Sequence, residues 1–344
     1  MKICIIGAGK RTREMYGPVL SSLPQIQVTG IWNRTFSKGE EVAREFSWKC
    51  YADLQKMIIN ETPDALLVVV NSSAIKHVVL GCMQYGIPII TETPVWDKEV
   101  PEASNKNNVP VYVNEQTPYL PCENFKMLLL ETGLFGSPHV VINDFRTFEF
   151  HGISQLRRYV GYEKVPAEVV GSVTHPSMVS YCDNNGKLQN QTETWEFGVI
   201  KFDSGQTAVY NFSSIYNRAP FRKPRSMRIY GSRGTIANDD NDFQVNLLKS
   251  DGTNEKIHVE VVGAYMSTKQ IKAQIGDKEI LWEKEDELDH LNDQHMAIRD
   301  VLLRNVTAIK LNKPELGYTC ASAFMDMNLL NAIRYSAHNK KFLP

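Results

Sequence analysis

The fold of this chain is decided by its first residues, Lys2-Ile3-Cys4-Ile5-Ile6-Gly7-Ala8-Gly9-Lys10-Arg11-Thr12. A short apolar run ends at two glycines, and a helical pattern follows to about Ser22. This order predicts a strand, a tight turn and a helix, the arrangement that binds the pyrophosphate of a dinucleotide. Thr12 replaces the third glycine of the full fingerprint, so the prediction also depends on the elements that follow.

Strand and helix patterns alternate up to about residue 115. Strands are predicted at 2–6, 27–32, 65–70, 88–90 and 109–113, and helices at 11–22, 37–46 and 74–85. The run at 65–70 is continuously apolar, which is typical of a strand covered on both faces. We therefore predict an α/β fold whose N-terminal domain is a Rossmann fold, a doubly wound parallel sheet.

The pattern changes after Tyr119. Strands are expected at 140–150, 195–202, 207–212, 226–230, 243–248 and 256–262, and helices at 121–132, 287–303 and 320–338. The alternating runs predict a C-terminal α+β domain with an open, mostly antiparallel sheet. We place the dinucleotide-binding domain at 1–118, and a domain for substrate binding and oligomerisation at 119–344.

Composition excludes several classes of partner. The 344 residues carry a net charge of -1, which predicts no attraction to nucleic acid or to an anionic membrane. The apolar runs are of strand length and too short to span a bilayer. Met1-Lys2 leads directly into the first strand, so we expect no cleavable leader and a cytoplasmic protein. The six cysteines form no CxxC pair, which predicts reduced thiols and no metal site.

The end of the second predicted strand bears on the choice of cofactor. An acidic residue there would bind the ribose 2′-hydroxyl of NAD. The sequence has Asn33-Arg34-Thr35-Phe36-Ser37-Lys38 instead, with no carboxylate before Glu40. Arg34 could pair with a 2′-phosphate through its planar fork, while Thr35 and Lys38 add donors, so NADP(H) is favoured over NAD(H). The alternative is that Arg34 stacks on the adenine.

Four later motifs carry a family resemblance. They are Asn71-Ser72-Ser73 with His77, Thr91-Glu92-Thr93-Pro94, Gly133-Leu134-Phe135-Gly136, and Arg228-Ile229-Tyr230-Gly231 with Gly234-Thr235. In this order the chain resembles the Gfo/Idh/MocA family (glucose-fructose oxidoreductase, inositol dehydrogenase, rhizopine catabolism). The resemblance implies a Rossmann domain, a second domain with an open antiparallel sheet, and a homodimer or homotetramer built on that sheet.

The turn, the second strand and the resemblance together predict the cofactor-binding residues. They are Gly7, Gly9, Lys10, Arg11, Thr12, Asn33, Arg34, Thr35, Lys38, Asn71, Ser72, His77, Glu92 and Pro94.

Two departures from the family concern the catalytic residues. The resemblance implies that the lysine of a Glu-Lys-Pro motif transfers a proton beside the nicotinamide. Thr93 occupies the position of that lysine here. Threonine can donate one hydrogen bond but cannot act as an ammonium acid. The second family motif places an Asp four residues before a His and another three after it, on a helix. We match this histidine to His175, where Gly171 and Met178 occupy the acidic positions.

Each remaining candidate has two interpretations. His175 could be a general acid or base, or a packed histidine. Tyr119 could donate to a substrate atom or fill the domain boundary, and Glu115 lies beside it as a candidate substrate contact. Arg157 and Arg158 could hold a substrate anion or lie on the solvated surface.

The sequence therefore predicts an NAD(P)-dependent oxidoreductase acting on a small molecule. Because a protonated imine needs little acid help, we favour reduction of an imine or carbonyl in a biosynthetic pathway. The alternatives are a sugar or cyclitol dehydrogenase, and a dinucleotide-binding regulatory or scaffold protein with reduced catalytic activity.

Overall fold

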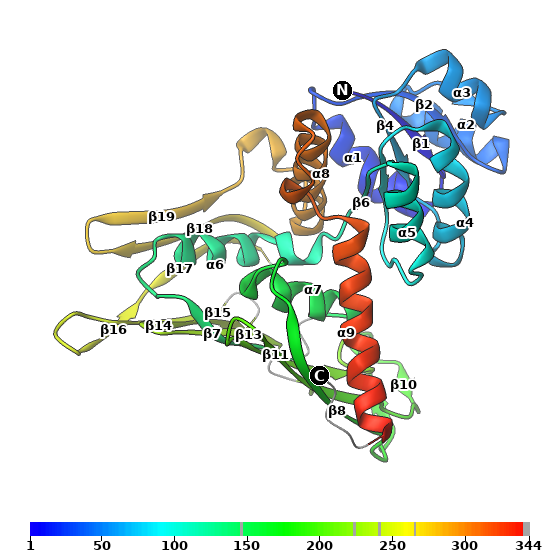
Figure 1. Ribbon diagram of the computed structural model, residues 1–344. Helices are drawn as coiled ribbons and strands as arrows, with labels where there is room; N and C mark the ends of the chain where they lie inside the picture. The colour runs from blue at the N-terminus through cyan, green and yellow to red at the C-terminus, as the bar shows by residue number, and fades with distance from the viewer. Residues whose placement is uncertain (145–146, 223–224, 240–241, 265, 340–344) are drawn as a thin grey trace. The chain divides into compact units, whose positions relative to one another are not determined.

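The computed structural model describes residues 1–144, 147–222, 225–239, 242–264 and 266–339 (Figure 1). The chain forms two compact units. Unit 1 comprises Met1–Leu120 and Glu285–Met327, and unit 2 comprises Pro121–Lys284 and Asn328–Pro344. Each unit is described by itself.

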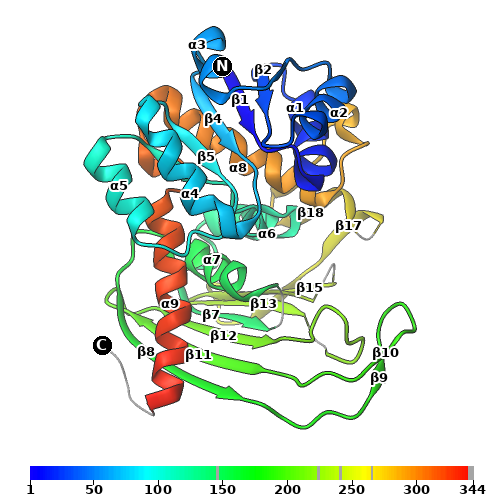
Figure 2. The same cartoon turned by 90° about the vertical axis from the view of Figure 1, so that its right-hand side faces the viewer.

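Unit 1 is built on a six-stranded sheet with the order β3-β2-β1-β4-β5-β6 (Figure 2). All of its strand pairs are parallel. The strands are β1 (Lys2–Ile6), β2 (Gln27–Trp32), β3 (Cys50–Tyr51), β4 (Ala65–Val68), β5 (Ile89–Thr91) and β6 (Val111–Val113). The strand order reverses between β1 and β4, which is where ligands bind in such sheets. The predicted Rossmann sheet is confirmed.

Helices connect these strands. They are η1 (Thr12–Tyr16) continuing into α1 (Gly17–Ser21), α2 (Phe36–Phe46), α3 (Leu54–Glu61), α4 (Ser72–Cys82), η2 (Met83–Tyr85), α5 (Glu99–Asn107) and η3 (Thr117–Tyr119). The first of them contains a π-helical segment, a form that is rare outside functional sites. The predictions lacked α3 and α5. α5 has few apolar residues, whereas Leu54, Met57 and Ile58 of α3 have a helical spacing that the sequence analysis did not use.

A late helix returns to unit 1. α8 (Asp293–Leu311) lies between η4 (Asp286–Leu288) and η5 (Pro314–Leu316). Its Ile298, Leu302 and Val306, spaced four residues apart, are buried in the same core as Ile3 and Tyr16. The sequence prediction places these residues in the second domain, 119–344. The compact units instead divide the chain after Leu120 and place Glu285–Met327 with the Rossmann sheet.

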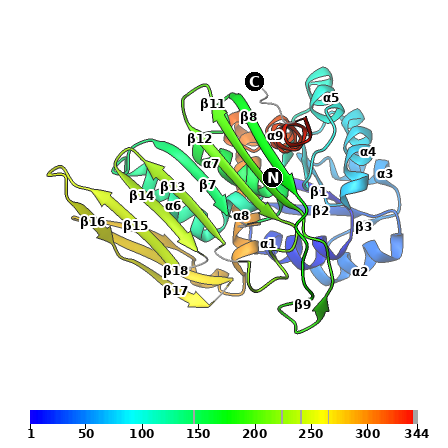
Figure 3. The same cartoon turned by 90° about the horizontal axis from the view of Figure 1, so that it is seen from below.

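Unit 2 is built on an eight-stranded sheet with the order β16-β15-β14-β13-β7-β12-β11-β8 (Figure 3). Its strands are β7 (Pro138–Asp144), β8 (Pro166–Thr174), β11 (Trp195–Phe202), β12 (Thr207–Ser213), β13 (Ser226–Gly231), β14 (Gly234–Asp239), β15 (Asp242–Leu248) and β16 (Asn254–Ile257). β12 pairs with β7 in parallel, whereas the other neighbours are antiparallel. The predicted open, mostly antiparallel sheet is confirmed.

Smaller elements complete unit 2. β17 (Val259–Ala264), β18 (Ser267–Ile275) and β19 (Lys278–Glu283) form a three-stranded sheet, and β9 (Tyr181–Cys182) pairs with β10 (Leu188–Gln189). The helices are α6 (Pro121–Glu131), α7 (Glu149–Val160) and the part of α9 (Cys320–Asn339) after Met327. α6 packs on β18 and β19, and α7 packs on β7 and β12.

The sequence prediction failed around α7. The strand predicted at 140–150 ends at Asp144, and α7 begins at Glu149. The buried Ile153, Leu156 and Val160 have helical spacing and cover the sheet, a signal that the neighbouring alternation obscured. Strand β8 was not predicted at all.

A row of β-branched side chains crosses the sheet. Val170, Val199, Val209 and Ile142 are register partners on four adjacent strands and are half-buried. Alternation directs them away from the face that α7 covers. The expected homodimer or homotetramer through this sheet stays a prediction.

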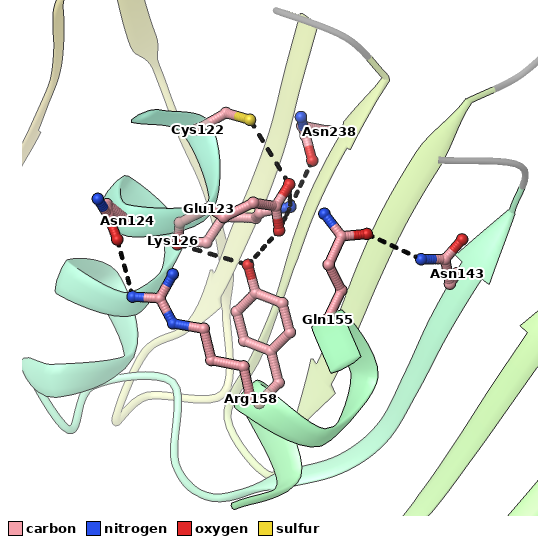
Figure 4. A network of polar contacts seen from close by, with 9 residues as sticks. Cys122, Glu123, Asn124, Lys126, Asn143, Gln155, Arg158 and Asn238 are labelled. Atoms are coloured by element: carbon pink, nitrogen blue, oxygen red, sulfur yellow. Dashed lines mark hydrogen bonds and ion pairs between the residues drawn. The ribbon is translucent and has the colours of Figure 1, made fainter. Parts of the chain in front are cut away.

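A buried polar network joins α6, α7 and β14 (Figure 4). The Lys126 ammonium lies 3.0 Å from the Glu123 carboxylate and 2.6 Å from Asn238 Oδ1, and both charged side chains are fully buried. The Tyr159 hydroxyl donates to Glu123 Oε2 at 2.5 Å. Burial and this carboxylate raise the pKa of Tyr159 well above its ordinary value. The network fixes the first turn of α6 against the end of α7.

We expect Lys126→Met to lower the free energy of unfolding by about 3–5 kcal/mol, because it leaves a buried carboxylate without its cation. Lys201→Met is the matched control, since Lys201 pairs with Glu168 at 2.8 Å but is 57% exposed. That change should cost less than about 1 kcal/mol. Urea denaturation measures both, and equal costs would contradict the assignment.

Candidate functional site

The glycine turn after β1 has the geometry that the motif predicts. Gly7 has a φ of 112°, and a Cβ there would lie 2.1 Å from the carbonyl oxygen of Val69. The amide of Gly7 donates to the Trp32 carbonyl at 2.8 Å. A Cβ on the exposed Gly9, in contrast, would meet nothing within 4 Å. The first glycine is therefore required by the fold, and the second leaves open space over the turn.

Thr12 and Asn33 hold this turn together. Thr12 is fully buried, and its hydroxyl donates to the Gly7 carbonyl at 2.9 Å. Asn33 Oδ1 accepts from the Ala8 amide at 3.1 Å, and its Nδ2 donates to the Thr35 carbonyl at 2.8 Å. Both residues stabilise the turn through their side chains, a supporting role in the predicted cofactor site.

The residues after β2 present unpaired positive charge. Arg34, Thr35 and Lys38 are all exposed. Neither Arg34 nor Lys38 makes an ion pair with a residue that the structure describes. The two side chains are therefore available to an anionic ligand.

The predicted residues at the start of α4 lie at the same edge of the sheet. Asn71 Oδ1 accepts from the Ala74 amide at 3.1 Å and caps the helix. Ser72 and His77 are exposed. A small hollow brings Ser72 and Pro94 together, and its lining is completed by Ile75, Lys76, Val95, Trp96, Asp97 and Val100.

Glu92 forms a buried polar cluster with the first helix. Its Oε1 accepts from Arg11 Nε at 2.8 Å and from the Tyr16 hydroxyl at 2.5 Å. Burial and the Glu92 carboxylate raise the pKa of Tyr16 well above its ordinary value. Thr93 is half-buried, its amide donates to Glu92 Oε2 at 3.3 Å, and a cis peptide bond joins it to Pro94.

Tyr119 and Glu115 are both buried in unit 1. The Arg304 guanidinium lies 5.0 Å from the Tyr119 ring centre, and Tyr119 packs against Ala297 and Val301 of α8. Glu115 Oε1 accepts from the Thr117 amide at 3.0 Å. These contacts favour the packing interpretation of Tyr119.

Arg157 and Arg158 have partners within unit 2. Arg157 is 2% exposed and donates from Nη2 to the Tyr162 carbonyl at 2.6 Å. Arg158 Nη2 donates to Asn124 Oδ1 of α6 at 2.8 Å, as Figure 4 shows. Both arginines therefore anchor α7 within unit 2. Neither occupies the solvated surface position that was the alternative to substrate binding.

His175 is not on a helix, contrary to the prediction. It follows strand β8, which ends at Thr174, and it is exposed. Its Nδ1 lies 3.3 Å from the Thr194 hydroxyl. The residues before it alternate and pair with β11, with Gly171 opposite Gly198, so the local structure is extended.

The first turn of α7 carries a histidine that the sequence analysis did not match to the family's histidine motif. His151 is half-buried, and its ring centre lies 4.2 Å from that of Phe150. Thr147 precedes it by four residues and Ser154 follows it by three, which are the family's two acidic positions. The helical context fits His151 better than His175. The helical spacing of the apolar residues after it was the available signal.

A family model matches residues 1–114, and its description is an oxidoreductase family with an NAD-binding Rossmann fold, GFO_IDH_MocA. Residues 1–114, which lie in unit 1, therefore match the NAD-binding domain of the Gfo/Idh/MocA oxidoreductases. The resemblance seen in the motifs is thus confirmed, as is the expectation of an NAD(P)-dependent oxidoreductase at the level of the family. A sequence search of curated proteins finds no significant match.

Solved structures of other proteins resemble the whole chain in fold. An oxidoreductase from Agrobacterium radiobacter, solved with NAD+, L-tartaric acid and magnesium, is 16% identical with a TM-score of 0.68, covering 100% of this chain and 98% of that one. A UDP-N-acetylglucosamine 3-dehydrogenase from Acidithiobacillus ferrooxidans is 14% identical with a TM-score of 0.66, covering 98% of each chain.

A third solved structure resembles the chain in fold. GenD2 of gentamicin A biosynthesis, solved with NAD, is 14% identical with a TM-score of 0.65, and the match covers 100% of this chain and 95% of that one.

Among the described residues, no helix combines the length and apolar character needed to cross a bilayer.

The Gly7 and Gly9 geometry makes a paired prediction. Gly7→Ala should lower the free energy of unfolding by about 2–5 kcal/mol, because its Cβ would collide with the Val69 carbonyl in a strained backbone. Gly9→Ala should change that free energy by less than about 1 kcal/mol but weaken dinucleotide binding, since its methyl group would enter the open space. Urea denaturation and a cofactor titration separate the two. A stable Gly7→Ala protein would contradict this geometry.

Proposed function

We propose that this protein binds NADP(H) in preference to NAD(H) and uses it to reduce an imine or carbonyl of a small molecule. The observation that carries the proposal is the open glycine turn with an unpaired Arg34 at the end of the neighbouring strand. When bound, the nicotinamide would donate or accept a hydride. The residues present suit the cofactor, because Gly9 leaves room for a diphosphate.

The charge after β2 supports the choice of NADP(H). A 2′-phosphate needs a planar cationic partner, and Arg34 is exposed and has no competing carboxylate among the described residues. Lys38, also exposed, adds a second cation within one helical turn.

We expect NADPH to bind at least about tenfold more tightly than NADH, which is the worth of one charge-assisted contact. Arg34→Met should reduce NADPH affinity to the level of NADH and leave NADH binding unchanged. Arg44→Met is the control, because Arg44 is an exposed arginine farther along α2. Titration of NADPH and NADH fluorescence measures the affinities. Tighter binding of NADH would contradict the 2′-phosphate assignment.

The choice of substrate follows from the proton donors. Thr93 cannot supply a proton as an ammonium group would, so a substrate that already carries its proton suits this chain. His151, half-buried on α7, is our candidate for the general acid or base of unit 2. Oxidation of a sugar is the second candidate, favoured by the similarity to a UDP-N-acetylglucosamine 3-dehydrogenase.

The two histidines separate these possibilities by mutation. With NADPH and a panel of cyclic imines, or NADP+ and a panel of polyols, His151→Ala should lower kcat/KM by about 10²–10⁴-fold. His175→Ala should change it by less than about threefold, because an exposed histidine after an edge strand holds no reacting atom. The reverse order of effects would restore the original assignment. Cofactor binding without turnover on either panel would favour a regulatory protein.

A further inference from the structure

Arg11 lies within the glycine turn and uses only part of its hydrogen-bonding capacity. Its Nε donates to Glu92 Oε1 at 2.8 Å, and its side chain is 35% exposed. No described residue accepts a hydrogen bond from either of its Nη groups. A guanidinium has five donors in one plane, so four remain open to solvent or to a ligand.

Buried groups fix the orientation of this guanidinium. The Glu92 side chain is 7% exposed and also accepts from the fully buried Tyr16 hydroxyl and from the Thr93 amide. A carboxylate that also accepts hydrogen bonds from Tyr16 and Thr93 cannot follow a moving arginine. Glu92 therefore holds the Nε edge of Arg11 and leaves the Nη edge accessible.

The glycine turn that precedes Arg11 in the chain is open at Gly9. Gly9, two residues earlier, is exposed, and a Cβ there would meet nothing within 4 Å. A planar guanidinium edge matches two oxygens of a phosphate group. We infer that Arg11 binds the diphosphate of the nucleotide, with Glu92 and Tyr16 as positioning residues. The inference rests on the proposed function and deepens it.

Two other charged groups define the electrostatics. The buried Glu115 also interacts with the Arg11 charge, so two carboxylates oppose one guanidinium. Directed hydrogen bonds, more than net charge, must then hold the diphosphate. Arg13, the next arginine of the first helix, is 57% exposed, lies 2.5 Å from Glu45, and is not one of the predicted cofactor-binding residues. It provides a control with the same change of charge.

The experiment measures binding of three probes by titration calorimetry. NADPH has a diphosphate and a nicotinamide, ADP-ribose has the diphosphate without the nicotinamide, and adenosine 2′-monophosphate has neither. Arg11→Met should weaken binding of NADPH and ADP-ribose by about 10- to 100-fold, and binding of adenosine 2′-monophosphate by less than about threefold. Arg11→Lys should recover only part of the loss, because it lacks the planar fork. Arg13→Met should weaken each probe by less than about threefold.

A double-mutant cycle tests the positioning role. Glu92→Gln should weaken NADPH and ADP-ribose in the wild-type background, and have no further effect on either probe in the Arg11→Met background. Glu115→Gln should strengthen both, since it removes an opposing charge. A purely structural role for Glu92 would give the same loss in both backgrounds and for all three probes.

Three results would overturn the inference. Arg11→Met could weaken NADPH but not ADP-ribose, which would place its action at the nicotinamide. Its effect could equal that of Arg13→Met, which would reduce the role of Arg11 to general charge. Full recovery of binding by Arg11→Lys would show that the planar guanidinium is not required. In each case wild-type binding of NADPH leaves the proposed function standing, whereas a wild-type protein that binds none of the probes removes both.

Discussion

The missing side chain at Gly7 is the constraint on which unit 1 depends. The amide of this residue donates to the Trp32 carbonyl at 2.8 Å, and a Cβ on its α-carbon would lie 2.1 Å from the Val69 carbonyl oxygen. It therefore sits between the chains leaving β2 and β4, at the point where the strand order reverses. Any Cβ would push these chains apart. The turn, the open space over Gly9 and the start of the first helix all follow from this contact.

Much of unit 1 could be predicted from the sequence, because its signals are local. The continuous apolar run of β4 and the strand–glycine–helix order need no knowledge of distant residues. The contacts that complete the site are not local. Arg11 meets Glu92 across 81 residues, and Ala8 meets Asn33 across 25. A sequence pattern identifies each partner as polar but does not reveal which polar residue it will meet.

The prediction of unit 2 failed where two periodicities overlap. Alternation in β7 runs directly into the helical spacing of α7, so one long strand was expected at 140–150. That error removed the helix on which a histidine would be sought and directed attention to His175. The charge of Arg157 and Arg158 left two interpretations open, a substrate contact or a solvated surface position, and the structure gives them partners inside the unit, the Tyr162 carbonyl and Asn124. Charge alone does not separate an anchor from a ligand contact.

The return of α8 to the Rossmann sheet has a consequence for biosynthesis. Ile298 and Val306 belong to the same core as Ile3, yet the ribosome makes them almost 300 residues later. The core of the N-terminal unit therefore cannot be completed while the middle of the chain is still being synthesised. Until then, the apolar residues that α8 covers in the folded protein stay exposed. Contacts so distant along the chain also slow folding, because a long loop must close first. A fragment that stops at residue 120 lacks part of its own core.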